Sequence, residues 1–387
     1  MARILVIGGG TAGTAAGLAL RKAGFEVTVH EAHPTAAEDI GAFLTLASNG
    51  MRALAQIDAS AAVTATGFEL TALSVLDGTG AELANRPLAG ADDPLLRYRC
   101  LRRGELNAAL QAEAVRRGVD VRHGARLVSV EAGPDAVTAH FTDGGTATGD
   151  LLVGADGLNS AVRHSFAPDT RPAYAGERVF YGYTTEAPVT EGTGRITLIR
   201  GSAAAFGYAV SPTGETYWFA RVTGEPLPPG DLADDTPDRW RELLLPLLRR
   251  DATPAAGIVA ATTDSIMVTH ATEMPPGASW RTARTLIIGD AAHAASPATG
   301  QGASMALEDA VVLAKALRDA PNIDKALTAY ESLRRSRVEH NIAVSGQISR
   351  RADSPAGPAV ATPPPTEDEL LRHLAWDTDV WTLARDA

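Results

Sequence analysis

The 387 residues can bury the cores of two or three domains, and 45% hydrophobic with 21% charged residues is ordinary for a globular protein. A formal net charge of −11 excludes a general attraction to nucleic acid, and no apolar run approaches the roughly 20 residues that span a bilayer. The single cysteine, Cys100, cannot form an intrachain disulfide, and a first strand predicted to begin at Arg3 leaves no room for a leader, so we expect a cytoplasmic protein without integral membrane association.

The chain begins with a predicted βαβ unit. Apolar residues favour a strand over 3–7 and a helix over about 11–23, followed by a second strand that ends at Glu31. The turn between the first strand and the helix reads Gly8-x-Gly10-x-x-Gly13, and Glu31 lies 18 residues after Gly13. This pattern is typical of a dinucleotide-binding fingerprint, with the pyrophosphate at the helix N-terminus and the acid on a ribose.

Two further acids follow predicted buried strands. After Asn107 the pattern predicts a helix of about a dozen residues, then several short strands with glycine-bearing turns, and then a strand that ends at Gly154-Ala155-Asp156-Gly157. Another strand ends at Gly289-Asp290, and a loop leads to a helix that starts near Gly302. A carboxylate and the free N–H groups of a helix start are thereby expected near one point, where a ligand with hydroxyl groups could bind.

Residues 171–274 lose helical periodicity. Their alternating pattern predicts an antiparallel sheet with one helix around 237–250, and strands are also expected within 66–98. Five aromatic residues in these strands either line a substrate pocket over the cofactor or pack the sheet against its helix: Tyr181, Tyr183, Phe206, Tyr208 and Trp218.

The histidines do not indicate a metal site. His30 and His33 follow one strand without further ligands, His270 is interpreted as a strand residue, and His293 as a structural one. Near the C-terminus, residues 352–365 form a Pro- and Ala-rich linker, and Thr366-Glu367-Asp368 predicts a helix start. The final helix could cover either the core or a partner.

Together, these motifs resemble those of one family, the group A flavoprotein monooxygenases, or p-hydroxybenzoate hydroxylase-like FAD-dependent aromatic hydroxylases and epoxidases. The resemblance runs from Arg3 to about Arg337 and rests on the glycine fingerprint with its acid, Arg-Gly-Glu-Leu at 103–106, "GADGLNSAVR" at 154–163, and "GDAAHAASPATGQGASMALEDA" at 289–310. "YESLRRSR" at 330–337 is similar to the helix that follows the flavin site in that family.

The resemblance implies an α/β fold: a Rossmann-like FAD-binding domain of the GR2 type, an inserted antiparallel β-sheet substrate domain, and C-terminal helices. The implied FAD-binding domain is discontinuous, over 1–70, 97–170 and 275–345. The substrate domain covers 71–96 and 171–274, and the linker and C-terminal helix cover 346–387.

The resemblance also implies the residues that hold non-covalent FAD. Gly8 to Gly13 and Glu31 would hold the AMP half, Arg103 would approach the pyrophosphate, and Asp290 the ribityl hydroxyls; Asp156 and Arg163 would lie on the face linked to both FAD and NAD(P)H. The full cofactor-binding set is Gly8, Gly10, Ala12, Gly13, Glu31, Arg103, Val128, Asp156, Gly289, Asp290, Gly300, Gly302 and Ala303. Pro297 and Gly300 would form a loop beside flavin C4a. Many relatives carry Arg after the strand-end acid, where this chain has Ala32.

The implied activity is that of an NAD(P)H-using monooxygenase, which inserts one atom of molecular oxygen into an aromatic or olefinic small molecule by way of a flavin C4a-hydroperoxide. A flavin-dependent halogenase is disfavoured, because no Trp-x-Trp-x-Ile-Pro stretch is present and no lysine occurs between Lys22 and Lys315. A non-oxygenating flavoprotein, or a scaffold or cyclase-like binding module of the same fold, remains an alternative. The substrate, the choice between NADH and NADPH, and the oligomeric state stay open.

Overall fold

The predicted βαβ unit is the centre of a five-stranded parallel sheet. The computed structural model describes residues 2–36, 41–189, 192–233, 236–350 and 363–386. In this sheet the strand order is β18-β12-β1-β2-β8, with every neighbouring pair parallel. The strands are β1 (Arg3–Ile7), β2 (Glu26–His30), β8 (Asp120–Arg122), β12 (Leu151–Gly154) and β18 (Thr285–Ile287). The three predicted strand-to-acid junctions, after β2, β12 and β18, therefore lie at the carboxyl edge of one parallel sheet, where ligands bind.

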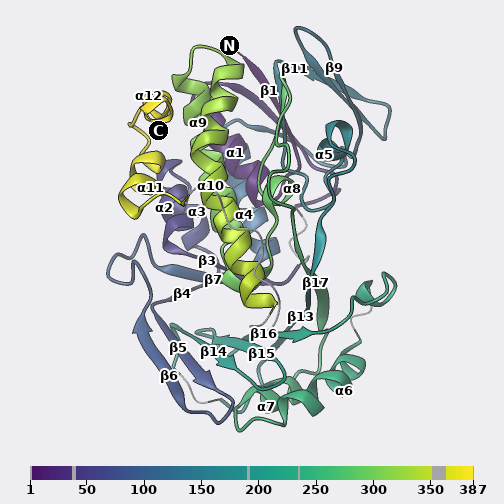
Figure 1. The fold of residues 1–387 in the computed structure, drawn as a ribbon, viewed down its shortest axis with the longest axis vertical. Coiled ribbons are helices and arrows are strands. Elements are labelled where there is room, and N and C mark those ends of the chain that lie inside the picture. Colours follow the sequence, from purple (N-terminus) through teal and green to yellow (C-terminus); the bar gives the residue numbers. More distant parts are fainter. Residues whose placement is uncertain (1, 37–40, 190–191, 234–235, 351–362, 387) are drawn as a thin grey trace.

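Helices cover this sheet, and the longest two run side by side in the upper part of Figure 1. The helix expected after Asn107 begins four residues earlier, at Arg103, because the chain turns directly from strand to helix there. The helices of this part are α1 (Thr11–Lys22), α2 (Ser48–Gln56), α3 (Ser60–Thr64), α4 (Arg103–Arg116), α5 (Ala161–Phe166), α8 (Asp290–His293), the 3-10 turn η2 (Pro297–Thr299), α9 (Gly302–Asp319) and α10 (Ile323–Ser349).

Two small antiparallel sheets flank the parallel one. The first has the order β11-β10-β9, with β9 (Leu127–Ala132), β10 (Val137–Phe141) and β11 (Thr146–Gly149). The second has the order β3-β7-β4, with β3 (Phe43–Leu46), β4 (Phe68–Leu70) and β7 (Tyr98–Arg102). Cys100 is fully buried in β7, where it packs with Phe43 and Phe68.

A seven-stranded sheet forms the lower part of Figure 1. Its order is β17-β13-β16-β15-β14-β5-β6, with β5 (Ala72–Asp77), β6 (Glu82–Pro87), β13 (Ala173–Thr184), β14 (Arg195–Arg200), β15 (Ala205–Val210), β16 (Thr216–Thr223) and β17 (Met267–Glu273). The 66–98 region does contribute strands, as expected. The sheet is not wholly antiparallel, however, because β5 pairs with β14 in the parallel direction.

One face of this sheet packs against two helices, and this corrects part of the aromatic prediction. Phe206, Tyr208 and Trp218 lie in a buried cluster with Trp240, and the Trp218 indole donates to Thr262 Oγ1 at 2.9 Å. These three aromatic residues therefore pack the sheet against its helices and do not face the parallel sheet. The helices are α6 (Pro237–Leu248) and α7 (Ala255–Ala260), preceded by the 3-10 turn η1 (Asp231–Ala233).

The C-terminal segment packs onto the core of its own chain. The predicted helix start is confirmed by α11 (Glu367–Leu374), whose capping box pairs Thr366 with Glu369, and α12 (Val380–Asp386) follows. Lys315 on α9 is fully buried and donates to the carbonyls of His373 and Ala375 at 2.5 Å each. Burial lowers the pKa of Lys315 to about 7. Residues 352–362 of the predicted linker lie outside the described residues. In the described part of the chain, no helix combines the length and apolarity that a membrane crossing needs.

Candidate functional site

The glycine turn after β1 leaves a strip of backbone open. Gly8 has φ +104°, and a Cβ there would lie 2.4 Å from the Ala155 carbonyl oxygen. A Cβ on Gly13 would lie 1.9 Å from the Gly8 oxygen, whereas one on Gly10 would meet no described atom within 4 Å. Two of the glycines are thus required by the turn itself. Gly10 instead faces open space at an uncapped helix start, which suits the approach of phosphate groups.

Glu31 and Gln111 hold this turn from the opposite side. The Glu31 carboxylate accepts the Gly9 and His33 N–H groups, both at 2.6 Å. Gln111 Nε2 donates to the Gly9 oxygen at 2.6 Å, but its buried Oε1 has no partner among the described residues. A buried acceptor of this kind is costly unless something donates to it. Its position beside Glu31 fits a ligand that carries hydroxyl groups.

Asp156 and Arg163 are fully engaged inside the protein. Asp156 accepts from Ser160 Oγ at 2.5 Å and from the Val162 N–H at 3.0 Å, so it holds the first turn of the short helix α5, whose cap is Ser160. Burial raises the pKa of Asp156, and these bonds oppose the rise. Arg163 is 4% exposed and donates to the Ala291 oxygen at 2.8 Å. It also donates to the carbonyls of Leu158 and Thr170, so Arg163 braces the backbone next to Asp290.

Asp290 lies beside the start of α1. Its carboxylate is exposed at the first residue of α8. The preceding Gly289 has φ +57°, and a Cβ there would lie 2.9 Å from the Cβ of Ala12. The third strand-to-acid junction and the start of α1 are therefore in contact. A free carboxylate next to a helix N-terminus can accept hydrogen bonds from the hydroxyls of a ligand held by that helix.

The second helix start, that of α9, also lies near this junction, because a Cβ on Gly289 would lie 3.5 Å from the Cβ of Ala306. The loop that begins at Pro297 reaches Gly300 in the left-handed conformation at φ +64°, and a Cβ there would lie 3.4 Å from Thr45 Oγ1. α9 then starts at Gly302 without a side-chain cap. A Cβ on Gly302 would meet no described atom within 4 Å, and Ala303 is half-buried. This end of α9 offers free N–H donors and a positive dipole end to an electron-rich group.

A buried ion cluster holds the backbone at Gly289, just before Asp290. We use the name for Glu308 and Asp309 of α9, His293 of α8, and Arg334 and Arg337 of α10. Asp309 accepts from the Gly289 N–H at 2.9 Å, His293 Nε2 at 2.5 Å and Arg334 Nε at 2.8 Å. Burial alone would raise the pKa of Asp309, but His293 and Arg334 outweigh it and lower the pKa to about 2. The predicted structural interpretation of His293 agrees with this contact.

Glu308 completes the cluster. It pairs with Arg334 at 2.6 Å and accepts from Arg337 Nη2 and Asn49 Nδ2 at 2.8 and 2.7 Å. Asn49 also donates to Gln301 Oε1 at 3.1 Å, at the cap position of α9. The start of α9 is thus fixed by buried charged and polar groups on two other helices.

Two residues that were predicted to bind the cofactor, Arg103 and Val128, lie outside the group of residues around Asp290. Arg103 is exposed at the first position of α4, where a Cβ on Gly41 would lie 3.3 Å from its Cδ. Val128 lies on β9 of the outer three-stranded sheet and is 61% exposed. Its side chain contributes nothing to the groups that surround Asp290.

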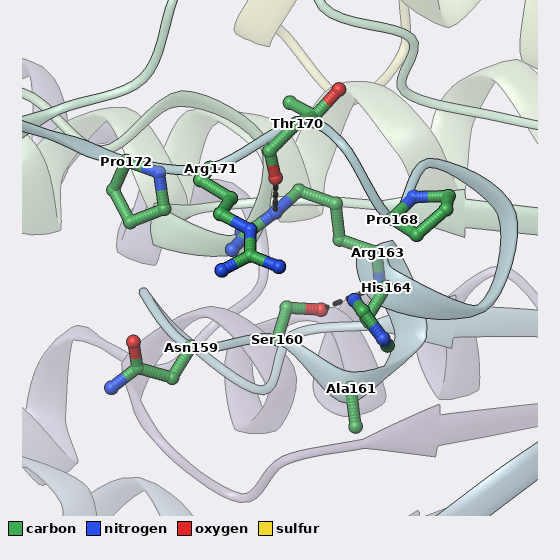
Figure 2. A pocket seen from close by; sticks show the side chains of 9 residues that line it. All are labelled: Asn159, Ser160, Ala161, Arg163, His164, Pro168, Thr170, Arg171 and Pro172. Carbon is green, nitrogen blue, oxygen red and sulfur yellow. Dashed lines mark hydrogen bonds between the residues drawn. The ribbon is translucent and has the colours of Figure 1, made fainter.

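An open cavity of about 480 Å³ lies behind α5, lined by Asn159, Ser160, Ala161, Arg163, His164, Pro168, Thr170, Arg171 and Pro172. Figure 2 shows the Arg163 guanidinium bonded to Thr170, whereas Arg171 projects into the cavity between Asn159 and Arg163. Arg171, His164 and Asn159 are exposed. They leave cationic and amide groups free for an anionic ligand.

The second face of the seven-stranded sheet carries aromatic side chains toward β3. Phe43 of β3 contacts the rings of Tyr181 and Tyr183 at centroid distances of 6.0 and 6.2 Å, and that of Tyr217 at 5.6 Å. Burial raises the pKa of Tyr181, against the opposing effect of Arg103 and Arg221. We call this face the aromatic face and define it by Tyr181, Tyr183, Tyr217 and Phe219. Only two of its four residues were predicted.

Other histidines take no part in a ligand cluster. His30 stacks on Phe141 at 4.6 Å, and its buried ring nitrogens have no partner among the described residues. His270 Nε2 accepts the Leu227 N–H at 2.8 Å. The described ranges contain no group of three His, Cys, Asp or Glu side chains that could hold a metal ion.

Several site residues were missed by sequence reasoning. Gln111 sits among the buried apolar positions of α4, and a glutamine in such a stripe is a signal that could have identified it. Glu308 and Asp309 form an acidic pair within a buried and mostly apolar stretch of α9, which gives a similar signal. Thr45 and Asn49 carry no local signal, because their roles depend on the packing of β3 and α2 against α9.

Comparisons with known proteins agree with this geometry. The family model for the FAD binding domain matches residues 1–345. The chain is 33% identical over 354 residues to aurachin C monooxygenase/isomerase of Stigmatella aurantiaca, covering 90% of this chain and 88% of that protein. It is 31% identical over 390 residues to 3-amino-4-hydroxybenzoate 2-monooxygenase of Streptomyces cremeus, covering 97% and 94%.

A solved structure extends the likeness to the whole fold. HpxO of Klebsiella pneumoniae, solved with FAD and uric acid, matches with a TM-score of 0.79 and 26% identity, covering 100% of this chain and 96% of that one. The open glycine strip, the Asp290 carboxylate and the two uncapped helix starts fit the same cofactor here. The chain therefore belongs to the FAD-binding-domain family of FAD-dependent monooxygenases, the group A flavoprotein monooxygenases.

Proposed function

We propose that this enzyme uses NAD(P)H and molecular oxygen to insert one oxygen atom into an aromatic or olefinic small molecule. The observation that carries the proposal is the contact between Phe43 of β3 and the aromatic face. The same strand holds Thr45 next to Gly300, so an apolar, aromatic surface adjoins the loop at the start of α9. Such a surface can stack an aromatic ring and exclude water from the reaction.

The residues of the chain bind and orient the cofactor. The Gly10 strip and the start of α1 would receive the diphosphate, with Glu31 and Gln111 near the adenosine ribose and Asp290 near the ribityl hydroxyls. The start of α9 would lie near the flavin ring and favour its reduced, anionic form. Bound FAD supplies the hydride acceptance and oxygen activation that amino-acid side chains lack.

The cavity behind α5 is a candidate docking site for the electron donor. Arg171 offers charge and hydrogen bonds to a diphosphate, His164 offers a hydrogen-bonding ring, and Arg163 connects the cavity wall to the backbone beside Asp290. Arg171→Ala is expected to raise the KM for NAD(P)H without changing FAD affinity. The exposed Arg249, on the seven-stranded-sheet side, provides the matched Arg249→Ala control. An unchanged KM would remove this cavity from the donor path.

The substrate is proposed as an aromatic compound with polar substituents. Relatives are named for aurachin C, 3-amino-4-hydroxybenzoate and 6-hydroxynicotinate, and one is an FAD-dependent urate hydroxylase. The tyrosine hydroxyls of the aromatic face suit substituents of this kind. We further propose a cytoplasmic location, where NAD(P)H is available and the lone cysteine stays reduced.

The test measures which aromatic compounds accelerate NAD(P)H oxidation. Urate, 3-amino-4-hydroxybenzoate and 6-hydroxynicotinate are the first probes, followed by a wider aromatic panel. With labelled oxygen gas, the product of an active compound should carry one labelled atom. Product oxygen that comes wholly from water, without later exchange, would rule the proposal out.

Gly10→Ala provides a matched test of the cofactor site. Because its methyl group meets no described atom within 4 Å, the variant should fold normally but bind FAD more weakly. Gly230→Ala, which is equally unobstructed and lies before η1, should change neither property. Equal FAD affinity of the two variants would place the diphosphate elsewhere.

A further inference from the structure

The loop from Ser296 to Gly300 is held by one face of α10. Thr299 Oγ1 contacts Asn341 Oδ1 at 2.9 Å and Ser345 Oγ at 2.8 Å, and Ser296 Oγ contacts Ser349 Oγ at 2.5 Å. We call these five side chains the polar seam. Its three helix members are spaced four residues apart, so they form a row along one side of α10.

Because the polar seam is buried, it defines one position of the loop against α10. Ser345, Ser349 and Ser296 are at most 2% exposed, and Asn341 is 8% exposed. A row of buried hydroxyl and amide groups is costly unless each finds its partner, and here the partners come from the loop. The loop can move away from α10 only by leaving these groups unpaired.

The end of α10 that carries the seam is itself fixed to the seven-stranded sheet. Arg350, which follows α10, pairs with Glu273 of β17 at 2.5 Å. A Cβ on Gly346 would lie 2.6 Å from Glu273 Oε2, so the glycine permits this approach. The next residue after Glu273, Met274, donates its N–H to the Ala294 oxygen at 2.8 Å. The loop is therefore anchored to a helix that has its own attachment to the sheet with the aromatic face.

We propose that Asn341, Ser345 and Ser349 are positioning residues that set the loop, and with it the start of α9, against the flavin. The inference rests on the proposed placement of the flavin ring beside Gly300. α9 begins two residues after Gly300, so a shift of Thr299 displaces the N–H donors that favour reduced flavin. The seam should therefore affect the reduced cofactor more than the oxidised one.

The test uses Thr299→Val and Ser345→Ala, alone and together, with Ser332→Ala as the matched control. Ser332 lies on the same helix, but its hydroxyl donates within the helix to the Ala329 oxygen at 2.9 Å. Amide hydrogen exchange over 298–302 in the FAD-free protein should speed up about fivefold in Ser345→Ala, which loses one hydrogen bond to the loop, and about 25-fold in Thr299→Val, which loses two. The double variant should show less than the product of the two single effects, because both remove the same contact.

The second readout is cofactor affinity in both redox states. In the seam variants the dissociation constant for reduced FAD should rise at least about fivefold, and that for oxidised FAD by less than about twofold. If the seam has a purely structural role, the seam variants will have a lower free energy of unfolding than the wild type. Their exchange rates over 298–302, and their ratio of the dissociation constants for reduced and oxidised FAD, will then equal those of Ser332→Ala. That result would overturn the proposal. If the wild-type protein binds no FAD, the proposed function fails, whereas the exchange result still decides whether the seam holds the loop.

Discussion

Replacement of Gly302 by Asp or Asn tests whether the start of α9 acts electrostatically on the flavin. Gly302 is the first residue of an 18-residue helix that has no acidic side chain in its first turn. A Cβ there meets no described atom within 4 Å, so both side chains fit without displacing a neighbour. The two variants are nearly equal in size and differ by one charge. We expect Gly302→Asp to have the lower FAD reduction potential.

The magnitude follows from the position of the charge. A carboxylate in the first turn offsets the positive helix end by about 0.5 to 1 kcal/mol at an exposed position. Gly302 is exposed, so the lower part of this range applies unless bound flavin shields the site. For a two-electron couple this corresponds to about 10 to 20 mV. The difference should shrink at high salt, since screening acts on exposed charges.

The assay is a potential measurement on FAD-loaded proteins with a reference dye. Gly230→Asp and Gly230→Asn serve as controls, because Gly230 has no described atom within 4 Å of an added Cβ but does not begin α9. The control pair should show equal potentials. Equal potentials in the Gly302 pair, with both proteins folded and loaded, would show that this loop shapes the site without a measurable effect of its dipole.

Two further predictions concern stability. Arg334→Met should lower the free energy of unfolding by about 3 to 5 kcal/mol in urea denaturation, because it leaves two buried carboxylates without their shared cation. Arg335→Met removes partly exposed ion pairs, a bond to the Ala278 oxygen and a contact over the Trp280 ring, and should cost less than Arg334→Met. Burial lowers the pKa of His30 to about 4 in the folded protein, so as the pH falls this histidine is protonated in the unfolded chain before it is protonated in the folded one. The free energy of unfolding should therefore decrease as the pH drops from 6.5 to 4. His30→Phe should weaken this pH dependence of stability, and the part that remains should come from His373, whose pKa is also lowered to about 4. An unchanged pH profile of stability would refute the contribution of His30.

The parts of the site that depend on strand ends could be predicted from the sequence. A buried strand followed by an acid is a local pattern, and a parallel sheet places such ends along one edge. The positions of Glu31, Asp156 and Asp290 at strand ends could therefore be predicted from the sequence pattern, and the structure places them after β2, β12 and β18. The hydrogen-bond partners of these acids, in contrast, depend on how the chain folds around each of them and cannot be predicted from this pattern. Asp156 binds the cap residue Ser160 and the first turn of α5 with its carboxylate, a role set by the turn that brings Ser160 back to it.

The aromatic residues show why the substrate side was harder. Tyr181 and Tyr208 both lie in alternating strands, yet they point to opposite faces of one sheet. Their faces depend on strand register, which pairs Tyr181 with Phe219 and Tyr208 with Trp218. A shift of one residue would exchange the faces, and no single strand sequence reports its partner. The polar seam could not be predicted from the sequence for a related reason, since its loop residues and their partners on α10 are 42 to 53 residues apart.

The burial of Cys100 makes the enzyme suitable for site-specific labelling. The thiol is fully enclosed in β7, and burial raises its pKa, so it should react slowly with maleimides while the protein is folded. A cysteine introduced at an exposed position would then be the single reactive thiol, without removal of the native one. Pairs of fluorophores, one on the parallel-sheet side and one on the seven-stranded sheet, could follow the separation of these two parts during turnover.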